Sequence, residues 1–149
     1  MKIYGQEQAP TKEVHSPITF STPPLANGYY YVSAILDALN DIGCFNMEIP
    51  HDFTSIIEAY IKVISKDTKA AAEWDLQAVY AGYGEAYNTH VETDTTTTYN
   101  VTASHIEKID VSGILTNLAA MDSLTVQIKM TDAALNCDLL PIELVLRYQ

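Results

Sequence analysis

The chain has 149 residues, a length that suits a single domain able to bury roughly two-thirds of its unfolded surface. Hydrophobic residues make up 48% and charged residues 18%, which is typical of a folded globular protein. Lys and Arg total 8 against 19 Asp and Glu, a formal net charge of −11. Such a balance disfavours partners that are bound through clustered cations, so we expect neither nucleic acid nor an anionic membrane surface as a partner.

The N-terminal residues lack the apolar core of a signal peptide, and no apolar run approaches the length of a membrane span. We therefore expect synthesis in the cytoplasm without a signal peptide. Cys44 and Cys137 lie far apart in sequence and have neither metal-site nor redox-motif spacing. They could form one disulfide, but without a secretion signal the sequence favours two buried thiols.

Residues 1–28 contain four of the six prolines: Pro10, Pro17, Pro23 and Pro24. Each proline fixes its own φ angle and removes a backbone hydrogen-bond donor, so we expect no central strand in this stretch. The sequence therefore predicts an extended N-terminal arm over 1–28. Such an arm packs either against a neighbouring subunit or on its own domain.

The segment from Tyr29 to Ile42 fits two kinds of element. Apolar residues recur at helical spacing between Val32 and Leu39, and Gly43 is placed to end a helix. Alternate residues from Tyr29 onward also fit one face of a strand. The sequence leaves strand and helix open here.

From Cys44 onward, apolar residues mostly alternate with polar ones, which is the spacing of a strand with one buried face. Five runs show this alternation clearly, and two weaker ones lie near 87–91 and 95–101. Runs with one core face and one wetter face are typical of antiparallel sheets. The apolar positions of the five runs are Phe45, Met47 and Ile49; Ile57, Ala59, Ile61 and Val63; Trp74, Leu76, Ala78 and Tyr80; Leu124, Val126, Ile128 and Met130; and Ile142, Leu144, Leu146 and Tyr148.

One short helix interrupts the strands. Ser112 can cap it, and Ile114, Leu115 and Leu118 form an apolar stripe of about two turns. The predicted fold class is all-β: an antiparallel, jelly-roll-like β-sandwich over residues 29–149, with this one short helix and the extended N-terminal arm.

The sequence carries no recognisable catalytic or cofactor motif. It has no nucleophile elbow and no phosphate-binding loop. No histidine pair has the spacing of a helical zinc site. We therefore expect no catalytic, cofactor-binding or metal-binding residues, no cofactor and no enzyme activity. The scattered histidines are His15, His51, His90 and His105.

The polar stretch from Gly82 to Thr98 is the richest in candidate ligands. Its side chains could gather around a metal ion, although their spacing matches no EF-hand. Its threonines favour extended backbone and indicate a polar hairpin or loop on the solvent face. The candidate metal ligands would be Glu85, His90, Glu92 and Asp94.

A third interpretation of this stretch is a contact with a symmetric subunit or with a ligand. The chain has ten tyrosines, and tyrosine suits such contacts because its side chain is large, stiff and amphipathic. A sugar-binding platform at Tyr29–Tyr31 or at Tyr80–Tyr87 is also open. The candidate contact residues are Tyr87, Asn88, Thr89 and His90.

Several short motifs lie between residues 45 and 148, outside the N-terminal arm. They are Ile49-Pro50-x-Asp52-Phe53, Gly84–His90, Thr95–Thr98, Ile109–Leu115, Leu118–Asp122 and a final strand that ends in an aromatic residue. Together they resemble a group of small uncharacterised proteins from phage-like and environmental sequences. The resemblance implies a jelly-roll-like sandwich with a role in a virion, and it carries over no catalytic residue. It departs at Met121, where the group would have a glycine before Asp122.

Three function hypotheses follow. The first is a non-enzymatic structural protein of a virus-like particle, a capsid-decoration or fibre-head protein on the virion surface that forms a homotrimer and contacts other virion proteins. The alternative is a carbohydrate-binding β-sandwich module with a glycan as partner. The third is a hydrolytic enzyme, which would need two carboxylates in one cleft. The spacing singles out no pair among Asp75, Glu85, Glu92 and Asp94.

Overall fold

The computed structural model describes residues 10–22, 26–28, 31–33, 35–131 and 138–149. Within these residues the only helix is one short 3-10 turn, and no helix is long and apolar enough to cross a membrane. The elements are β1 (Lys12–Thr22), β2 (Ala26–Gly28), β3 (Tyr31–Ser33), β4 (Ile42–Glu48), β5 (Ile56–Ser65), β6 (Lys69–Glu73), β7 (Asp75–Ala81), β8 (His90–Asp94), β9 (Thr98–Val101), β10 (Ile106–Asp110), η1 (Ser112–Ile114), β11 (Ser123–Lys129) and β12 (Leu139–Tyr148).

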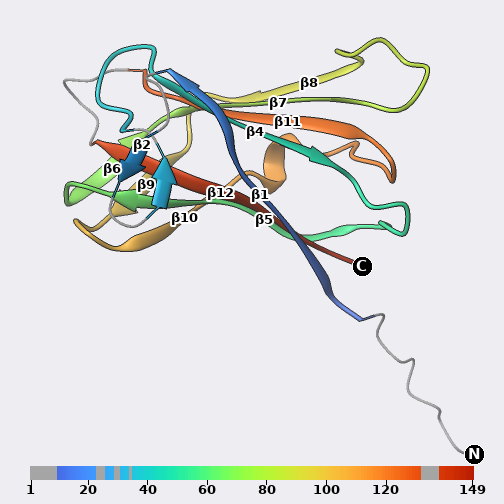
Figure 1. Cartoon of the computed structure of the whole chain (residues 1–149), viewed down its shortest axis with the longest axis horizontal. Helices are drawn as coiled ribbons and strands as arrows, with labels where there is room; N and C mark the ends of the chain where they lie inside the picture. The colour runs from blue at the N-terminus through green and yellow to red at the C-terminus, as the bar shows by residue number, and fades with distance from the viewer. Residues whose placement is uncertain (1–9, 23–25, 29–30, 34, 132–137) are drawn as a thin grey trace, which may run out of the picture.

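The strands form two stacked layers (Figure 1). The first layer, here the four-stranded sheet, has the order β10-β5-β12-β1, and the second, the five-stranded sheet, has the order β1-β4-β11-β7-β8. All neighbouring strands are antiparallel. Two short pairs, β2-β3 and β6-β9, stand beside them. The predicted all-β, antiparallel, jelly-roll-like sandwich is thereby confirmed.

The alternating runs bury most of their apolar positions between the layers, and Ile57, at 42% exposed, is an exception. Phe45 of β4, Leu76 of β7, Val126 of β11 and Leu144 of β12 are all at most 2% exposed. Trp74, just before β7, is also buried, as its run predicts. Because both sheets contribute to one continuous core, removal of these side chains from water is the main stabilising contribution.

Strand β1 corrects the expectation that residues 1–28 contain no central strand. Residues Lys12–Pro17 pair with β12, and Ile18–Thr22 pair with β4, so β1 passes from one sheet to the other. Figure 1 shows β1 running obliquely between the layers. Pro17 lies where the partner strand changes, and a missing backbone N–H costs least at such a point. Of the remaining arm, 1–9 and 23–25 lie outside the described residues.

The ambiguous segment 29–42 contains strand rather than helix where it is described. Tyr31–Ser33 is β3, Leu36 forms an isolated β-bridge with Leu139, and β4 begins at Ile42. Positions 29, 30 and 34 lie outside the described residues.

The helix expected after Ser112 is shorter than its apolar stripe suggested. Only Ser112–Ile114 is helical, as a 3-10 turn, although Ile114 and Leu115 are buried as predicted. The Ser112 hydroxyl does not cap the turn; it accepts a hydrogen bond from the backbone N–H of Ala59 at 3.0 Å. The segment therefore anchors to β5 rather than continuing as an α-helix.

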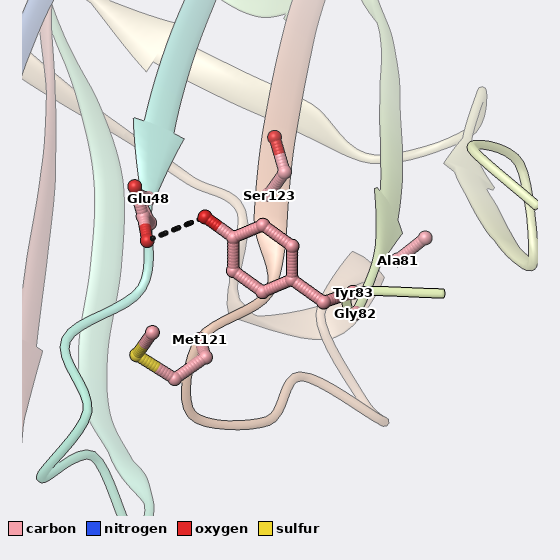
Figure 2. A pocket seen from close by; sticks show the side chains of 6 residues that line it. All are labelled: Glu48, Ala81, Gly82, Tyr83, Met121 and Ser123. Carbon is pink, nitrogen blue, oxygen red and sulfur yellow. Dashed lines mark hydrogen bonds between the residues drawn. The ribbon is translucent and has the colours of Figure 1, made fainter. Parts of the chain in front are cut away.

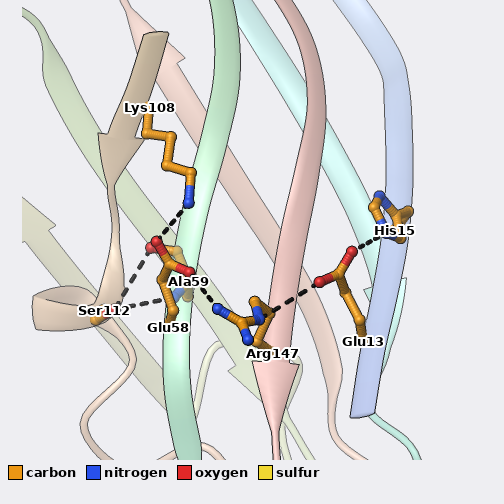
Figure 3. Close-up of polar contacts among 7 residues, drawn as sticks. All are labelled: Glu13, His15, Glu58, Ala59, Lys108, Ser112 and Arg147. Carbon is orange, nitrogen blue, oxygen red and sulfur yellow. Dashed lines mark hydrogen bonds and ion pairs between the residues drawn. The ribbon is translucent and has the colours of Figure 1, made fainter. Parts of the chain in front are cut away.

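The outer face of the four-stranded sheet carries a network of alternating charges (Figure 3). Glu58 at its centre accepts hydrogen bonds from Lys108 at 2.7 Å and from Arg147 at 3.0 Å. Lys108 also lies over the ring of Tyr60, 4.1 Å from its centroid. These charges pair with one another across four strands, which leaves this face electrostatically satisfied. The contacts run in the order Lys108, Glu58, Arg147, Glu13, His15, Glu143 and Lys62.

Replacing Glu58 tests this network. Hydrogen bonds from Lys108 and then Arg147 lower the pKa of Glu58. Its contribution to stability is therefore present above the unfolded-state pKa and is lost as pH falls through the lower folded-state pKa. We expect Glu58→Gln to lower the Tm at pH 7 by about 1–3 °C, because exposed ion pairs contribute little. The Tm difference from the parent should shrink at about pH 3.

The matched control is Glu107→Gln on β10. The Glu107 carboxylate accepts a hydrogen bond from the backbone N–H of Thr102 at 3.1 Å, and glutamine can accept the same bond. This control should behave like the parent at both pH values. Thermal unfolding followed by circular dichroism measures all three proteins, and an unchanged Tm difference for Glu58→Gln at pH 3 would contradict the role of the ionised carboxylate.

Candidate functional site: the polar face of the five-stranded sheet

The outer face of the five-stranded sheet is polar where its inner face is apolar. On β7, Gln77 lies between the buried residues Leu76 and Ala78, so its side chain points outward. Directly opposed residues share a face, and the strand register therefore places the outward residues of neighbouring strands beside one another. We call this surface the polar face; it comprises Asn46, Glu48, Asp75, Gln77, Val79, Val91, Thr93, Ser123, Thr125, Gln127 and Lys129.

Three shallow hollows follow one another along the polar face. One of about 170 Å³ lies between the ends of β4, β7 and β11. A second, of about 280 Å³, shares Ala81, Gly82 and Ser123 with the first. The third, of about 240 Å³, lies at the other end, over Gln77 and Gln127. The face is thus hollowed over much of its length.

Two successive turns after β7, Gly82–Glu85 and Ala86–Thr89, present two tyrosines at one end of the polar face. Tyr83 is 81% exposed and Tyr87 is 83% exposed. The first turn is held by the Gly82 N–H, which donates to the Glu85 carboxylate at 2.9 Å, and Gly84 has a positive φ of 86° that favours glycine. The second is closed by the Thr89 N–H, which donates to the Ala86 carbonyl at 3.0 Å. The two tyrosines therefore stand in solvent on adjacent turns fixed by hydrogen bonds.

Each tyrosine lines one of the adjoining hollows. Tyr83 lines the first hollow, and its hydroxyl lies 3.4 Å from the Glu48 carboxylate. Figure 2 shows its ring crossing from Gly82 toward Glu48, with Met121 on the same side. Tyr87 lines the second hollow. An exposed aromatic ring beside a polar hollow can stack on a flat apolar surface while its neighbours form hydrogen bonds.

Two rows of side chains that run across the strands of the polar face differ in whether their polar groups bond to other side chains of the protein. In the first row, Asn46 donates to the Thr19 hydroxyl at 2.7 Å and accepts from the Thr125 hydroxyl at 2.7 Å. This row is therefore internally paired. Asn46 also lies on β4 beside the crossing strand β1, which ties the row to the fold.

The second row consists of polar side chains that lie directly opposite one another. It runs across Gln127, Gln77 and Thr93, which oppose one another on β11, β7 and β8. Among the described residues, these three side chains have no hydrogen-bond partner. At the β4 end of the row, Cys44 is half-buried, and burial raises the pKa of its thiol. Phe20 of β1 opposes Cys44 and is 54% exposed.

The predicted contact residues Tyr87, Asn88, Thr89 and His90 have different surroundings in the structure. Tyr87 lines a hollow of the polar face, while Asn88 is exposed and lines none of the hollows described here. The Thr89 hydroxyl donates to the carbonyl of Ala86 within the turn. His90 begins β8 and stacks on the buried ring of Tyr80, with centroids 5.0 Å apart. Of the four, Tyr87 is the one that lines a hollow of this face, and contact of the others with a subunit or ligand stays a prediction.

The candidate metal ligands Glu85, His90, Glu92 and Asp94 also separate. Glu85 closes the turn after β7, whereas Asp94 accepts backbone N–H bonds from Thr96 and Thr97. In the described part of the chain, no group of three or more His, Cys, Asp or Glu side chains is placed to hold a metal ion.

Glu92 is instead the centre of a hydrogen-bonded cluster. It accepts from the hydroxyls of Tyr80 and Thr116. Burial, reinforced by Glu92, raises the pKa of Tyr80 to about 12. Burial alone would raise the pKa of Glu92, but the bonds from Tyr80 and Thr116 lower it overall. The cluster ties β7 and β8 to the segment after η1, which is a structural role.

The tyrosine platforms considered from the sequence are resolved only in part. Tyr80 is buried, so a platform over Tyr80–Tyr87 reduces to Tyr83 and Tyr87. Positions 29 and 30 lie outside the described residues, as does Cys137. Cys44 is a free thiol. Sequence reasoning missed Gln77 and Gln127; their outward positions in two alternating runs were the signal that could have found them.

Comparisons with known proteins return structural neighbours alone. No protein-family model matches the sequence, and no curated protein matches it. A solved structure, the CBM36-1 domain of a multidomain xylanase from the hindgut metagenome of Trinervitermes trinervoides, is 12% identical with a TM-score of 0.48 and covers 91% of this chain and 96% of its own. Another, a carbohydrate-binding module CBM36 in complex with calcium and xylotriose, is 11% identical with a TM-score of 0.42 and covers 89% and 97%.

The expected role as a structural protein of a virus-like particle is wrong. The two neighbours are carbohydrate-binding modules, and neither is a virion protein. Within the described part of the expected arm, Lys12–Thr22 pairs with strands of its own domain, where the first hypothesis had the arm reach onto a neighbouring subunit. The predicted homotrimer and the contacts with other virion proteins lose that basis. The resemblance to phage-like proteins stays a prediction that these comparisons do not test.

Met121, beside the first hollow, carries a testable backbone constraint. Its φ is +68°, a left-handed conformation that disfavours a side chain, which gives a physical reason for the glycine expected at this position. We expect Met121→Gly to raise the free energy of unfolding by about 0.5–1 kcal/mol, because relief of the strain exceeds the entropic cost of glycine. Urea unfolding measures this change.

The control is Met121→Ala, which removes the side chain but keeps the left-handed cost. It should be no more stable than the parent. A larger gain for Met121→Ala than for Met121→Gly would show that the methionine side chain, not its φ angle, is the unfavourable element.

Proposed function

We propose that this chain is a non-catalytic carbohydrate-binding module that holds its glycan on the polar face of the five-stranded sheet. The observation that carries the proposal is the pair of tyrosines, Tyr83 and Tyr87, both more than 80% exposed on adjacent turns beside polar hollows. Two exposed aromatic rings close together beside polar hollows offer a ligand more stacking surface than one isolated exposed ring would. The structural neighbours are themselves carbohydrate-binding modules.

The chemistry of the face suits a sugar better than a catalytic reaction. Sugar rings present apolar C–H faces and hydroxyl edges, so they match aromatic rings flanked by hydroxyl, amide and carboxylate groups. Two of the acidic residues considered for hydrolysis are engaged in structural hydrogen bonds: Glu92 accepts one from Tyr80, and Asp94 accepts one from the backbone of Thr96 in a turn. Asp75 and Glu85 lie toward opposite ends of the polar face. These placements support binding without bond cleavage.

Truncation of the two tyrosines tests the proposal. Tyr83→Ala and Tyr87→Ala should each weaken glycan binding by about three- to tenfold, because each removes one stacking surface. Binding is measured by affinity electrophoresis and by depletion from solution with insoluble polysaccharides. Both variants should keep the parent Tm, since neither side chain is buried.

The matched control is Ile106→Ala on β10, in the opposite sheet. Ile106 is 55% exposed, so its truncation removes exposed apolar surface without touching the polar face. It should bind glycans like the parent. Absence of binding to every polysaccharide tested would contradict the proposed function. So would an equal loss of glycan affinity in Ile106→Ala and in the tyrosine variants.

A further inference from the structure

The class of glycan follows from the row that Gln127, Gln77 and Thr93 form across three strands. Both glutamines are half-buried, and their positions in the ladder restrict how their side chains can point. A glutamine amide donates two hydrogen bonds and accepts others, and a sugar hydroxyl does both. Since these groups have no partner within the described residues, the row offers several outward hydrogen bonds to a ligand.

The strands under the row favour a ligand that binds side chains rather than backbone. β7 is paired on one side with β11 and on the other with β8, and β11 is paired with β4 and β7. Their backbone groups are therefore committed to the sheet, so a peptide cannot add as a further strand here. A ligand that lies over β7 and β11 therefore has to be recognised through side chains.

The charges around the polar face disfavour an anionic ligand. Glu48 and Glu85 line the hollows at the tyrosine end. Among the residues that line the three hollows, Lys129 is the only cation, and it directly opposes Asp75. Carboxylate and sulfate groups are usually bound by arginine or lysine pairs, which this surface does not present. The net charge of −11 adds a general repulsion.

The distance between the two ends of the face sets a minimum length for the ligand. Gln77 and Ala81 are four positions apart on β7, which corresponds to roughly 13 Å along a strand. The tyrosine turn begins immediately after Ala81. A single sugar ring cannot reach from this turn to the glutamine row, whereas a chain lying along β7 and β11 can.

We infer that the polar face binds an uncharged polysaccharide in extended form, which lies along β7 and β11 and contacts Tyr83 and Tyr87 at one end and Gln77 and Gln127 at the other. This inference rests on the proposed function and adds to it the charge, length and direction of the ligand. The tyrosines supply stacking, and the glutamine row supplies hydrogen bonds to hydroxyl groups.

The charge of the ligand is tested with matched polymers. The whole chain is run by affinity electrophoresis through gels that contain xylan, β-glucan, galactomannan or hydroxyethylcellulose, and through gels that contain carboxymethylcellulose, alginate or polygalacturonate. We expect retardation by at least one neutral polymer and by none of the anionic ones. Retardation by an anionic polymer as strong as by the neutral ones would overturn the inference but leave glycan binding in place.

The direction and length are tested with variants. Gln77→Ala and Gln127→Ala should each weaken binding of the retarding polymer by about three- to tenfold, through loss of outward hydrogen bonds. They should leave unchanged the weaker binding of a short oligosaccharide of the same sugar, which reaches the tyrosines only. Asn117→Ala is the matched control, because Asn117 is an exposed amide that lines none of the three hollows.

The outcomes separate the two proposals. If the tyrosine variants lose binding while both glutamine variants bind the polymer like the parent, the extended placement is wrong and the proposed function stands. If no polymer retards the chain, both fail. Thermal unfolding of each variant, expected within about 2 °C of the parent for surface substitutions, confirms that the losses report on binding.

Discussion

The passage of β1 from one sheet to the other is the constraint on which the polar face depends. The Ser16 hydroxyl, buried at the crossing, donates to the backbone carbonyl of Asn46 at 2.6 Å. This bond joins β1 to β4 at the point where the pairing of β1 changes strand. A one-residue slip of β4 would turn its outward side chains inward. The register of β4 is passed on to β11 and then to β7, so the position of every outward glutamine follows from it.

The two outer faces of the sandwich show how similar polar composition leads to different roles. On the four-stranded sheet, lysine, arginine and glutamate side chains alternate and satisfy one another. On the five-stranded sheet, neutral amides and hydroxyls predominate, and the row of Gln127, Gln77 and Thr93 keeps its hydrogen-bonding groups free in the described structure. A face whose polar groups are mutually paired gains little from a ligand, whereas free groups held by a rigid ladder can exchange water for ligand at low entropic cost.

The sequence predicts the strands that obey a period of two and misses those that break it. The runs around Leu76 and Val126 bury one face as expected, because every second residue is apolar. β1 escapes prediction because prolines argue against a central strand, yet Pro17 lies where the partner strand changes. The helix after Ser112 is shorter than its apolar stripe predicts. The stripe does not reveal that the Ser112 hydroxyl, the expected helix cap, accepts a hydrogen bond from the backbone of β5 instead. Local pattern thus predicts burial, while tertiary contacts decide where elements begin and end.

The candidate site could be predicted only in part, because it is assembled from distant positions. That Gln77 and Gln127 point outward is implied by their alternating runs, but that they oppose each other depends on the pairing of β7 with β11, fifty residues apart in sequence. Tyr80 and Tyr83 are the same residue type and lie three positions apart, yet Tyr80 is fully buried and Tyr83 is 81% exposed. The difference arises because β7 ends at Ala81: Tyr80 still lies on the strand, whereas Tyr83 lies on the turn held by Gly82 and Glu85. A binding face of this kind therefore depends on strand register and on where one strand ends. The residue types along the sequence do not by themselves predict it.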